Sequence, residues 1–311
     1  MDKVHINHGR MISCRIRSRI WRRDLAYDWT RKGVVAGVAL VAATAILLVL
    51  GAARGAAVGD RPDGSVRAEL PPAASDRIYA APGTAARPIV VIDAGHGGTD
   101  PGAISVSGQV SEKQLTLALA SELRDLLVKR GRVRVAMTRD DDRYLTLDER
   151  AAVARRLSAG LFVSLHIDSA PNPLARGASV YSLSDVASDE EAAHLAASQN
   201  RGFAADVAGD SVRNLLSDLA MRDQMDDSAG FAARLVGKSA GRFDLRPEPH
   251  RFAAFRVLKS AGTPAVLFEA GYISNADDEV LLRNPEHRNA IVLALAQAIE
   301  SDVATRSRLQ S

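Results

Sequence analysis

An apolar run that ends in a glycine-rich turn constrains this chain more than any other stretch. Residues 89–92 read Ile-Val-Val-Ile, and Asp93 leads into a turn with glycine at positions 95, 97, 98 and 102. Such a run predicts a buried, parallel-type strand, and α/β proteins place functional groups where these strands end. His96 lies in this turn, where the glycines leave room for its imidazole to face an open site. We interpret His96 as a candidate metal ligand or acid-base group.

The elements that follow alternate between strand and helix. Leucines at helical spacing predict a helix over 112–130, which Gly131 ends. The order strand, helix, strand, helix, strand, strand predicts an α/β fold with an open, mostly parallel twisted sheet flanked by helices on both faces. The patterns predict strands at 133–138, 161–166, 180–183 and 265–269, a short strand at 255–258, and helices at 146–157, 188–200, 211–222, 228–241, 277–283 and 286–304.

Residues 184–240 contain no strand pattern and are too long for a simple crossover, so we expect a helical insertion there. The approach to the strand expected at 255–258 holds Pro247 and Pro249, and this proline content leaves that wall of the domain undefined. The folded domain is expected to cover residues 88–304. Before it, residues 54–87 are rich in Ala, Gly and Pro without apolar periodicity, which predicts a flexible linker.

The front of the chain has the pattern of a membrane or export segment. Residues 33–53 carry no charged side chain, and as a helix they would span roughly 30 Å, the thickness of the hydrocarbon layer. Residues 1–32 hold nine Lys and Arg against three Asp, which predicts a basic leader that stays cytoplasmic. The rest of the chain is therefore expected in the periplasm or cell envelope, exported or anchored to the inner membrane. A cleaved signal and an uncleaved anchor both remain open.

Charge and cysteine content exclude two classes of protein. The leader carries a net charge of +6, so the other residues carry −3 of the total of +3, and the high pI belongs to the leader rather than to a nucleic-acid-binding surface. Cys14 is the only cysteine of the sequence and lies in the leader. No disulfide can therefore stabilise the exported part.

Four side chains are expected to converge at one edge of the sheet. His96 follows the first strand, Glu112 begins the first helix, His166 ends the third strand and Glu269 ends the last one. Parallel strands align their carboxyl ends, and two histidines with one carboxylate form the ligand set of catalytic zinc. A further carboxylate that does not bind the metal could act as a general base. We read Asp93, Asp100 and Asp168 as turn residues rather than as partners of the histidines, because Asp beside Gly or Pro favours turns.

A second catalytic pattern occurs at residues 237–241, Gly-Lys-Ser-Ala-Gly, which fits the Gly-x-Ser-x-Gly motif of serine hydrolases. That motif requires a strand directly before the serine, whereas residues 231–236 have a helical pattern. We therefore consider a serine hydrolase the less favoured alternative.

Five segments give the chain a resemblance to a known family. They are residues 91–102, Glu112-Lys113, Thr138-Arg139 with Leu147 and Arg150, residues 164–169, and Glu269-Ala270-Gly271-Tyr272-Ile273-Ser274-Asn275. In this order and spacing they resemble the zinc-dependent N-acetylmuramoyl-L-alanine amidases of the cell-division type, which cut bacterial peptidoglycan. The resemblance implies that His96, Glu112 and His166 bind Zn²⁺, that Glu269 is the catalytic carboxylate, and that the enzyme serves cell-wall remodelling and daughter-cell separation. The rival interpretation is a non-catalytic peptidoglycan-binding or regulatory protein on the same fold.

The resemblance also implies a form of regulation. In cell-division members of this family a helical insertion covers the zinc site until a partner protein displaces it, and residues 184–240 stand at that position. An acidic side chain there could occupy the open position of the metal. The candidates are Glu190, Glu191, Asp206 and Asp210. We therefore expect peptidoglycan as substrate, a possible periplasmic activator acting on the insertion, no nucleic acid, and membrane contact through the N-terminal segment if it is uncleaved.

Overall fold

The structure is a computed structural model that describes residues 75–201 and 211–309, with the main chain alone for residues 211–218. The predicted leader, the segment 33–53, most of the predicted linker, and Asp206 and Asp210 lie outside the described residues. Within the described range, no helix is both long enough and apolar enough to span a membrane.

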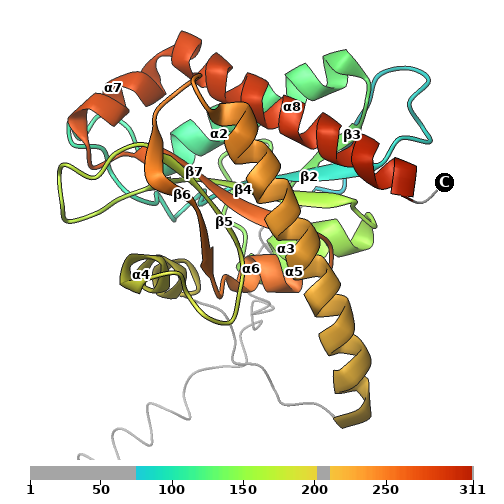
Figure 1. Ribbon diagram of the computed structural model, residues 1–311. Coiled ribbons are helices and arrows are strands. Elements are labelled where there is room, and N and C mark those ends of the chain that lie inside the picture. Colours follow the sequence, from blue (N-terminus) through green and yellow to red (C-terminus); the bar gives the residue numbers. More distant parts are fainter. Residues whose placement is uncertain (1–74, 202–210, 310–311) are drawn as a thin grey trace, which may run out of the picture. The chain divides into compact units, whose positions relative to one another are not determined.

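A seven-stranded sheet forms the centre of the domain (Figure 1). The pairings β2–β3, β2–β4, β4–β7 and β5–β6 are parallel, whereas β1 pairs antiparallel with β3, and β5 with β7. The predicted mostly parallel sheet is therefore confirmed. In spatial order the strands are β1 (Ile78–Tyr79), β3 (Arg134–Met137), β2 (Ile89–Ala94), β4 (Leu161–Asp168), β7 (Ala265–Tyr272), β5 (Ala178–Leu183) and β6 (Leu245–Ala253).

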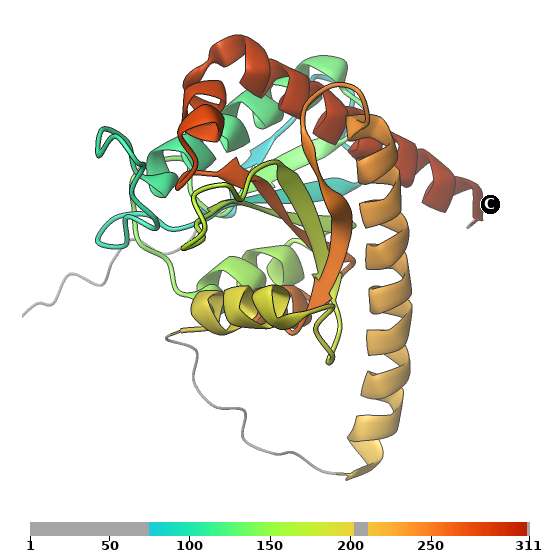
Figure 2. The same ribbon diagram turned by 60° about the vertical axis from the view of Figure 1, so that its left-hand side comes forward.

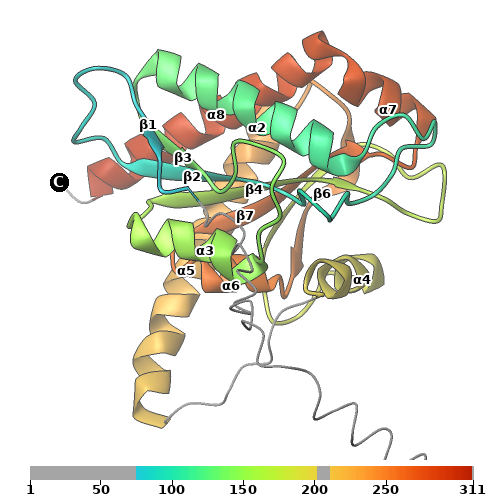
Figure 3. The same cartoon turned by 180° about the vertical axis from the view of Figure 1, so that it is seen from behind.

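Helices cover both faces of the sheet, as Figures 1 and 3 show from opposite sides. One face packs against α2 (Glu112–Arg130), α5 (Ser211–Ser239), α7 (Ala276–Arg283) and α8 (Pro285–Leu309). The other face packs against α3 (Leu147–Arg156), α4 (Glu190–Gln199) and α6 (Arg256–Ser260). Alternate residues of β2 point to opposite sides, Val90 and Ile92 to the first core and Ile89 and Val91 to the second. The continuous apolar run of β2 thus reflects burial on both faces.

The ends of α2 follow from its sequence. Ser111 and Gln114 form a capping box at the start, and Gly131 ends the helix in the left-handed conformation with φ of 63°. The helix therefore covers 112–130, as predicted. Its first residue is Glu112, so the capping residues fix where this carboxylate stands relative to the sheet.

The insertion contains fewer helices than predicted. Residues 211–222 and 228–241 were expected as two helices, but α5 is uninterrupted, as Figure 2 shows. Polar residues in and beside the predicted break pack on the domain instead of forming a loop. Gln224 donates to the carbonyl of Leu258 at 2.9 Å, and the hydroxyl of Ser228 accepts from the amide of Ala265 at 2.9 Å. Polarity at these positions therefore marked buried contacts and not a break.

The prediction of a short strand at 255–258 is wrong. Phe255 is the N-terminal cap of α6, in which Val257 and Leu258 are buried. A short apolar run does not distinguish a buried strand from a buried helical turn. The strand lies earlier, as β6, and includes Pro247 and Pro249. β6 is an edge strand, and its register against β5 shifts in this region, which is where a sheet tolerates proline.

The folded domain also begins earlier than residue 88. Residues 78 and 79 form β1, which pairs with β3, and Thr84 is buried in the turn that follows. The linker prediction is therefore wrong for residues 75–87. A two-residue edge strand is too short to produce an alternating pattern in the sequence.

Candidate metal centre

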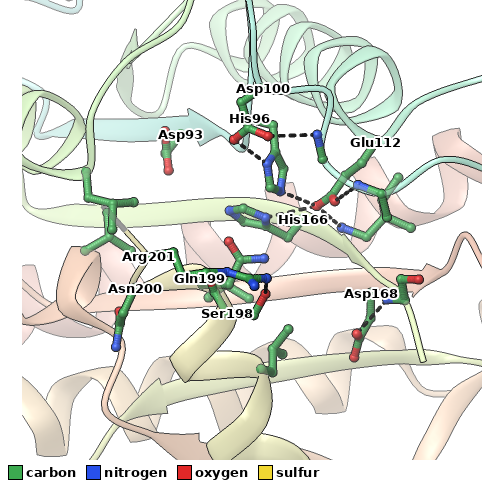
Figure 4. Close-up of a pocket in the computed structure, with 18 of the residues that line it drawn as sticks. Asp93, His96, Asp100, Glu112, His166, Asp168, Ser198, Gln199, Asn200 and Arg201 are labelled. Carbon is green, nitrogen blue, oxygen red and sulfur yellow. Dashed lines mark hydrogen bonds and ion pairs between the residues drawn. The ribbon is translucent and has the colours of Figure 1, made fainter. Parts of the chain in front are cut away.

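Three predicted ligands meet at the carboxyl edge of the sheet. His96 follows β2, Glu112 begins α2, and His166 lies near the end of β4, the parallel neighbour of β2. One ligand atom of each lies within 4.8 Å of the others. Figure 4 shows the two imidazoles and the carboxylate pointing toward one another. The convergence expected from the sequence is thus present in the structure.

Glu112 joins the two histidines. Its Oε1 lies 3.0 Å from Nε2 of His96 and 3.0 Å from Nδ1 of His166. Its Oε2 accepts a hydrogen bond from the amide of Ala103 at 3.0 Å, which fixes the plane of the carboxylate. Among the described residues, the buried Nε2 of His96 has no hydrogen-bond partner with proper geometry. A buried nitrogen without a partner, beside a carboxylate and a second imidazole, fits the donor set of a divalent transition-metal ion.

Two glycines allow this close approach. A Cβ at residue 95 would lie 2.4 Å from Cε1 of His166, and one at residue 102 would lie 2.6 Å from Oε2 of Glu112. Gly102 also has φ of 65°, which favours glycine. The glycines of the turn therefore make room for His166 and Glu112, in addition to the room for the imidazole of His96 expected from the sequence.

Asp100 orients the first histidine. Its Oδ2 lies 2.8 Å from Nδ1 of His96, and its Oδ1 accepts a hydrogen bond from the amide of Gly102 at 3.0 Å. Our reading of Asp100 as a turn residue alone was therefore wrong, because the same carboxylate forms the turn and holds the imidazole. A partner on the second ring nitrogen fixes the tautomer that leaves Nε2 free for a metal.

The protonation of the ligands follows from burial and from their contacts. Burial lowers the pKa of His96, but its contacts with the carboxylates of Asp100 and Glu112 outweigh burial and raise that pKa to about 9. Burial raises the pKa of Glu112, yet the two histidines hold it well below its usual value. Burial dominates at His166 and lowers its pKa. Without a metal, His96 therefore carries the proton that a metal must displace.

Glu269 lies beside the ligands but away from solvent. It pairs with His166 across β4 and β7 and with Ser179 across β7 and β5, so its side chain emerges on the same face as His166. The side chain is fully buried, and neither carboxylate oxygen has a hydrogen-bond partner among the described residues. Burial, followed by the nearby charges of Asp168 and Glu112, raises the pKa of Glu269 well above its usual value.

A cavity of about 660 Å³ opens beside the three ligands. His96, Glu112 and His166 line it, whereas Glu269 does not. The opposite wall comes from α4 and the residues after it, and Figure 4 shows Ser198, Gln199, Asn200 and Arg201 across from the histidines. The cavity thus separates the ligand cluster from part of the predicted insertion.

The two described candidates for a blocking acid stand in different surroundings. Glu190 is 91% exposed and lies 3.7 Å from His194. Glu191 faces the cavity, where its Oε1 and Oε2 accept hydrogen bonds from Arg246 at 2.6 and 2.9 Å. Within the described part of the chain, neither glutamate joins the ligand cluster.

Asp168 also lines the cavity, at the end of β4. Its Oδ1 accepts from the amide of Ser169 at 2.6 Å, as a turn residue would, while its buried Oδ2 has no partner within the described residues. Burial raises the pKa of Asp168 to about 6.

The serine-hydrolase alternative finds no support at Ser239. This residue lies in the last turn of α5 and is buried, and its hydroxyl donates to the carbonyl of Leu235 at 2.9 Å. A hydroxyl inside a helix, bonded to its own backbone, is not an exposed nucleophile on a strand-to-helix turn.

The sequence patterns did not predict the buried ion pair of Asp93 and Arg150 behind the candidate ligands. Asp93 was read as a turn residue, but it is buried in β2 and lies 2.8 Å from the guanidinium of Arg150. The signal was present, because Arg150 falls on the apolar side of α3 together with Leu147, Ala151 and Ala154. A charged residue on the buried side of a helix requires a partner in the core.

Comparisons with known proteins identify the family of the chain. A family model described as N-acetylmuramoyl-L-alanine amidase matches residues 90–301. The chain is 36% identical over 221 residues to N-acetylmuramoyl-L-alanine amidase AmiA of Escherichia coli K12. The aligned residues cover 68% of this chain and 75% of that protein. It is 33% identical to N-acetylmuramoyl-L-alanine amidase AmiC of Escherichia coli O6:H1, over 79% of this chain and 60% of that protein. The solved structure of Ami1 from Mycobacterium smegmatis shares the fold, with a TM-score of 0.53, 23% identity, and coverage of 70% of this chain and 97% of that one.

We predict that the affinity of this site for a divalent metal falls as the pH falls from 9 to 7. His96, with a pKa of about 9, must lose a proton before Nε2 can bind. Each pH unit below 9 should therefore weaken binding by about tenfold. Competition with a chromogenic chelator at pH 7, 8 and 9 measures this, with circular dichroism as a control for folding. An affinity that is constant over this range would contradict the prediction.

Proposed function

Because the chain belongs to the N-acetylmuramoyl-L-alanine amidase family and is an enzyme that hydrolyses amide bonds of peptidoglycan, we propose that His96, Glu112 and His166 bind zinc and that Glu269 is the catalytic carboxylate. The bond cleaved is the amide between the lactyl group of N-acetylmuramic acid and L-alanine. The observation that carries the proposal is the convergence of two imidazoles and one carboxylate within 4.8 Å.

The chemistry of the donors favours zinc over harder cations. Imidazole nitrogens suit zinc, whereas calcium and magnesium prefer oxygen ligands. A bound zinc ion supplies a Lewis acid that polarises a carbonyl group and acidifies water. Three protein ligands are also the number found in catalytic zinc sites, which keep one position open. Asp100 supports this role because it pairs with Nδ1 of His96, so that Nε2 is the ring nitrogen that faces the metal once the ring has lost a proton.

Glu269 has the properties of a proton-transfer group. Burial raises the pKa of its carboxyl well above the usual value, as in carboxyl groups that serve as general acids and bases. We propose that it takes a proton from the attacking water and gives it to the leaving amine. Because Glu269 is fully buried and does not line the cavity, the wall around it must open before substrate reaches this carboxyl.

We predict that Glu269→Gln abolishes amidase activity but retains zinc. The amide keeps the size of the side chain but cannot accept the proton, so the rate should fall by about 10²- to 10⁴-fold. Release of dye from labelled sacculi measures activity, and zinc content per chain measures binding. Glu300→Gln is the matched control, since Glu300 is a buried glutamate of α8 held by Arg130 and Arg132.

An active Glu269→Gln enzyme would refute the assignment of the catalytic residue. Zinc-loaded parent enzyme that binds sacculi without releasing dye would instead support the non-catalytic alternative. The two results can be told apart because the first is measured on the Glu269→Gln variant and the second on the parent protein.

We also propose that residues 184–240 control access to the site and that an activator protein acts on them. In the described part of this segment, Glu191 ties α4 to the sheet. Arg246 donates to both of its oxygens, Arg251 approaches Oε2 at 3.3 Å, and the hydroxyl of Tyr272 donates to Oε1 at 2.9 Å. We infer that Glu191 acts through these contacts to keep α4 against the cavity. Whether Asp206 or Asp210 contributes stays a prediction.

We predict that Glu191→Gln raises the rate of peptidoglycan hydrolysis by the chain alone. Loss of a partly exposed ion pair costs about 1 kcal/mol or less, which corresponds to at most about a fivefold rise in the open population. Glu190→Gln is the control, because the adjacent Glu190 is exposed and holds no part of the sheet. Equal rates for the parent and both variants would disprove this role of Glu191.

The substrate sets where the enzyme must act. Peptidoglycan lies outside the cytoplasmic membrane, so we propose that the catalytic domain works in the periplasm, in remodelling of the cell wall and separation of daughter cells. The basic leader and the apolar segment 33–53 support export or anchoring.

A further inference from the structure

Two buried arginines lie behind the ligand cluster and bind its main chain. Arg139 follows β3 and Arg150 lies on α3, and both side chains are almost fully buried. Four of their hydrogen bonds go to carbonyl oxygens of residues 94–96, the segment that carries His96. A guanidinium offers five donors in a fixed planar arrangement, so it can hold several acceptors in one geometry.

Arg150 contacts the turn at two carbonyls. Its Nη1 donates to Oδ1 of Asp93 at 2.8 Å and to the carbonyl of Ala94 at 2.7 Å. Its Nη2 donates to the carbonyl of His96 itself at 2.6 Å. The guanidinium therefore bridges the end of β2 and the residue that supplies the first metal ligand.

Asp93 fixes the place of this guanidinium. Its Oδ1 also accepts from the hydroxyl of Thr138 at 2.7 Å, and its Oδ2 accepts from the hydroxyl of Ser164 at 2.7 Å. These partners lie on or beside β3 and β4, the two neighbours of β2. Three adjacent strands thus define where Arg150 stands.

Arg139 holds the carbonyls in between. Its Nε donates to Ala94 at 2.9 Å, and its Nη2 donates to Gly95 at 2.8 Å and to Lys113, the residue after Glu112, at 2.9 Å. Together the two arginines bind three consecutive carbonyls, those of residues 94, 95 and 96.

The contact with His96 matters because its backbone is strained. His96 has φ of 60°, in the left-handed region that residues other than glycine rarely adopt. Such a conformation persists only where its surroundings enforce it. A return to the common region would redirect the imidazole, whose Nε2 now lies 3.0 Å from Oε1 of Glu112.

We propose that Arg150 is a positioning residue: anchored by Asp93, it holds the main chain of His96 in the left-handed conformation and thereby aims the imidazole at the metal. The inference rests on the proposed zinc site and adds to it a residue that lines the cavity but is not one of the three candidate ligands. An ordinary core ion pair would need only Asp93, whereas this guanidinium makes two further hydrogen bonds to the turn.

The test is Arg150→Lys in the full chain. Lysine keeps the charge and the stem but cannot hold Asp93 and two carbonyls in one plane. We expect zinc affinity, measured by competition with a chromogenic chelator, to fall at least about tenfold, as for other groups that orient a metal ligand. The absorption spectrum of the cobalt-substituted site should also change, since the histidine moves. Arg156→Lys is the matched control, because Arg156 lies on the same helix and pairs with the exposed Asp76.

A merely structural role would give a different result. Val292→Ala, in the core of α8, should lower the unfolding midpoint while zinc affinity and the cobalt spectrum stay as in the parent. If Arg150→Lys does not fold, Asp93→Asn replaces it as the test. We expect Asp93→Asn to bind zinc more weakly than Val292→Ala does. The proposal is refuted if folded Arg150→Lys has the zinc affinity and the cobalt spectrum of the parent. The same result for Asp93→Asn refutes it where that variant is the test.

His96→Ala distinguishes failure of the proposed metal site from failure of the positioning role of Arg150. If His96→Ala binds zinc as the parent does, the proposed metal site itself is wrong. If His96→Ala loses zinc while Arg150→Lys keeps it, the metal site stands and the positioning role alone is refuted.

Discussion

The burial of Glu112 between two histidines is the interaction on which the catalytic edge depends. A carboxylate removed from water is unstable unless opposite charge and hydrogen bonds replace its hydration. Here two imidazoles and the amides of Ala103 and Ile167 surround it. The three ligands come from β2, α2 and β4, so the fold must bring three separate elements to one point. The glycines at 95 and 102 permit this approach, because any larger residue would meet a ligand atom.

Charge on this face of the sheet is arranged in layers. Glu112 and Asp168 line the cavity and raise the pKa of the buried Glu269, whereas Arg139 and Arg150 lie behind the first turn. Among the described residues, Arg150 forms an ion pair with Asp93, and both arginines also donate to backbone carbonyls. Arg139 even has its pKa lowered to about 10 by burial and by Arg150. This positive layer opposes the negative groups in front of it, which a metal ion would neutralise further.

Sequence patterns predicted most of the fold and the ligand set, for a physical reason. Buried parallel strands are continuous apolar runs, and capped helices such as α2 carry their own start and stop signals. The predictions were wrong where a contact between residues far apart in the sequence overrode the preference of the local pattern. Gln224 fell in the predicted break between two helices because the residues there are polar, yet it donates to a carbonyl of α6 within one continuous helix. Likewise Asp100 looked like a turn residue, and it is one, but its second oxygen also holds His96.

The position of Glu269 connects the geometry of the site to its control. It is paired with His166 in the sheet, yet it is excluded from the cavity that the histidines line. The face on which it lies is the face that α3, α4 and α6 cover. Movement of α2 or α8 would not uncover it, because those helices lie on the opposite side of the sheet. Among the described residues, α4 lies on the same side of the sheet as Glu269, and Glu191 joins this helix to Arg246 of β6 and Tyr272 of β7.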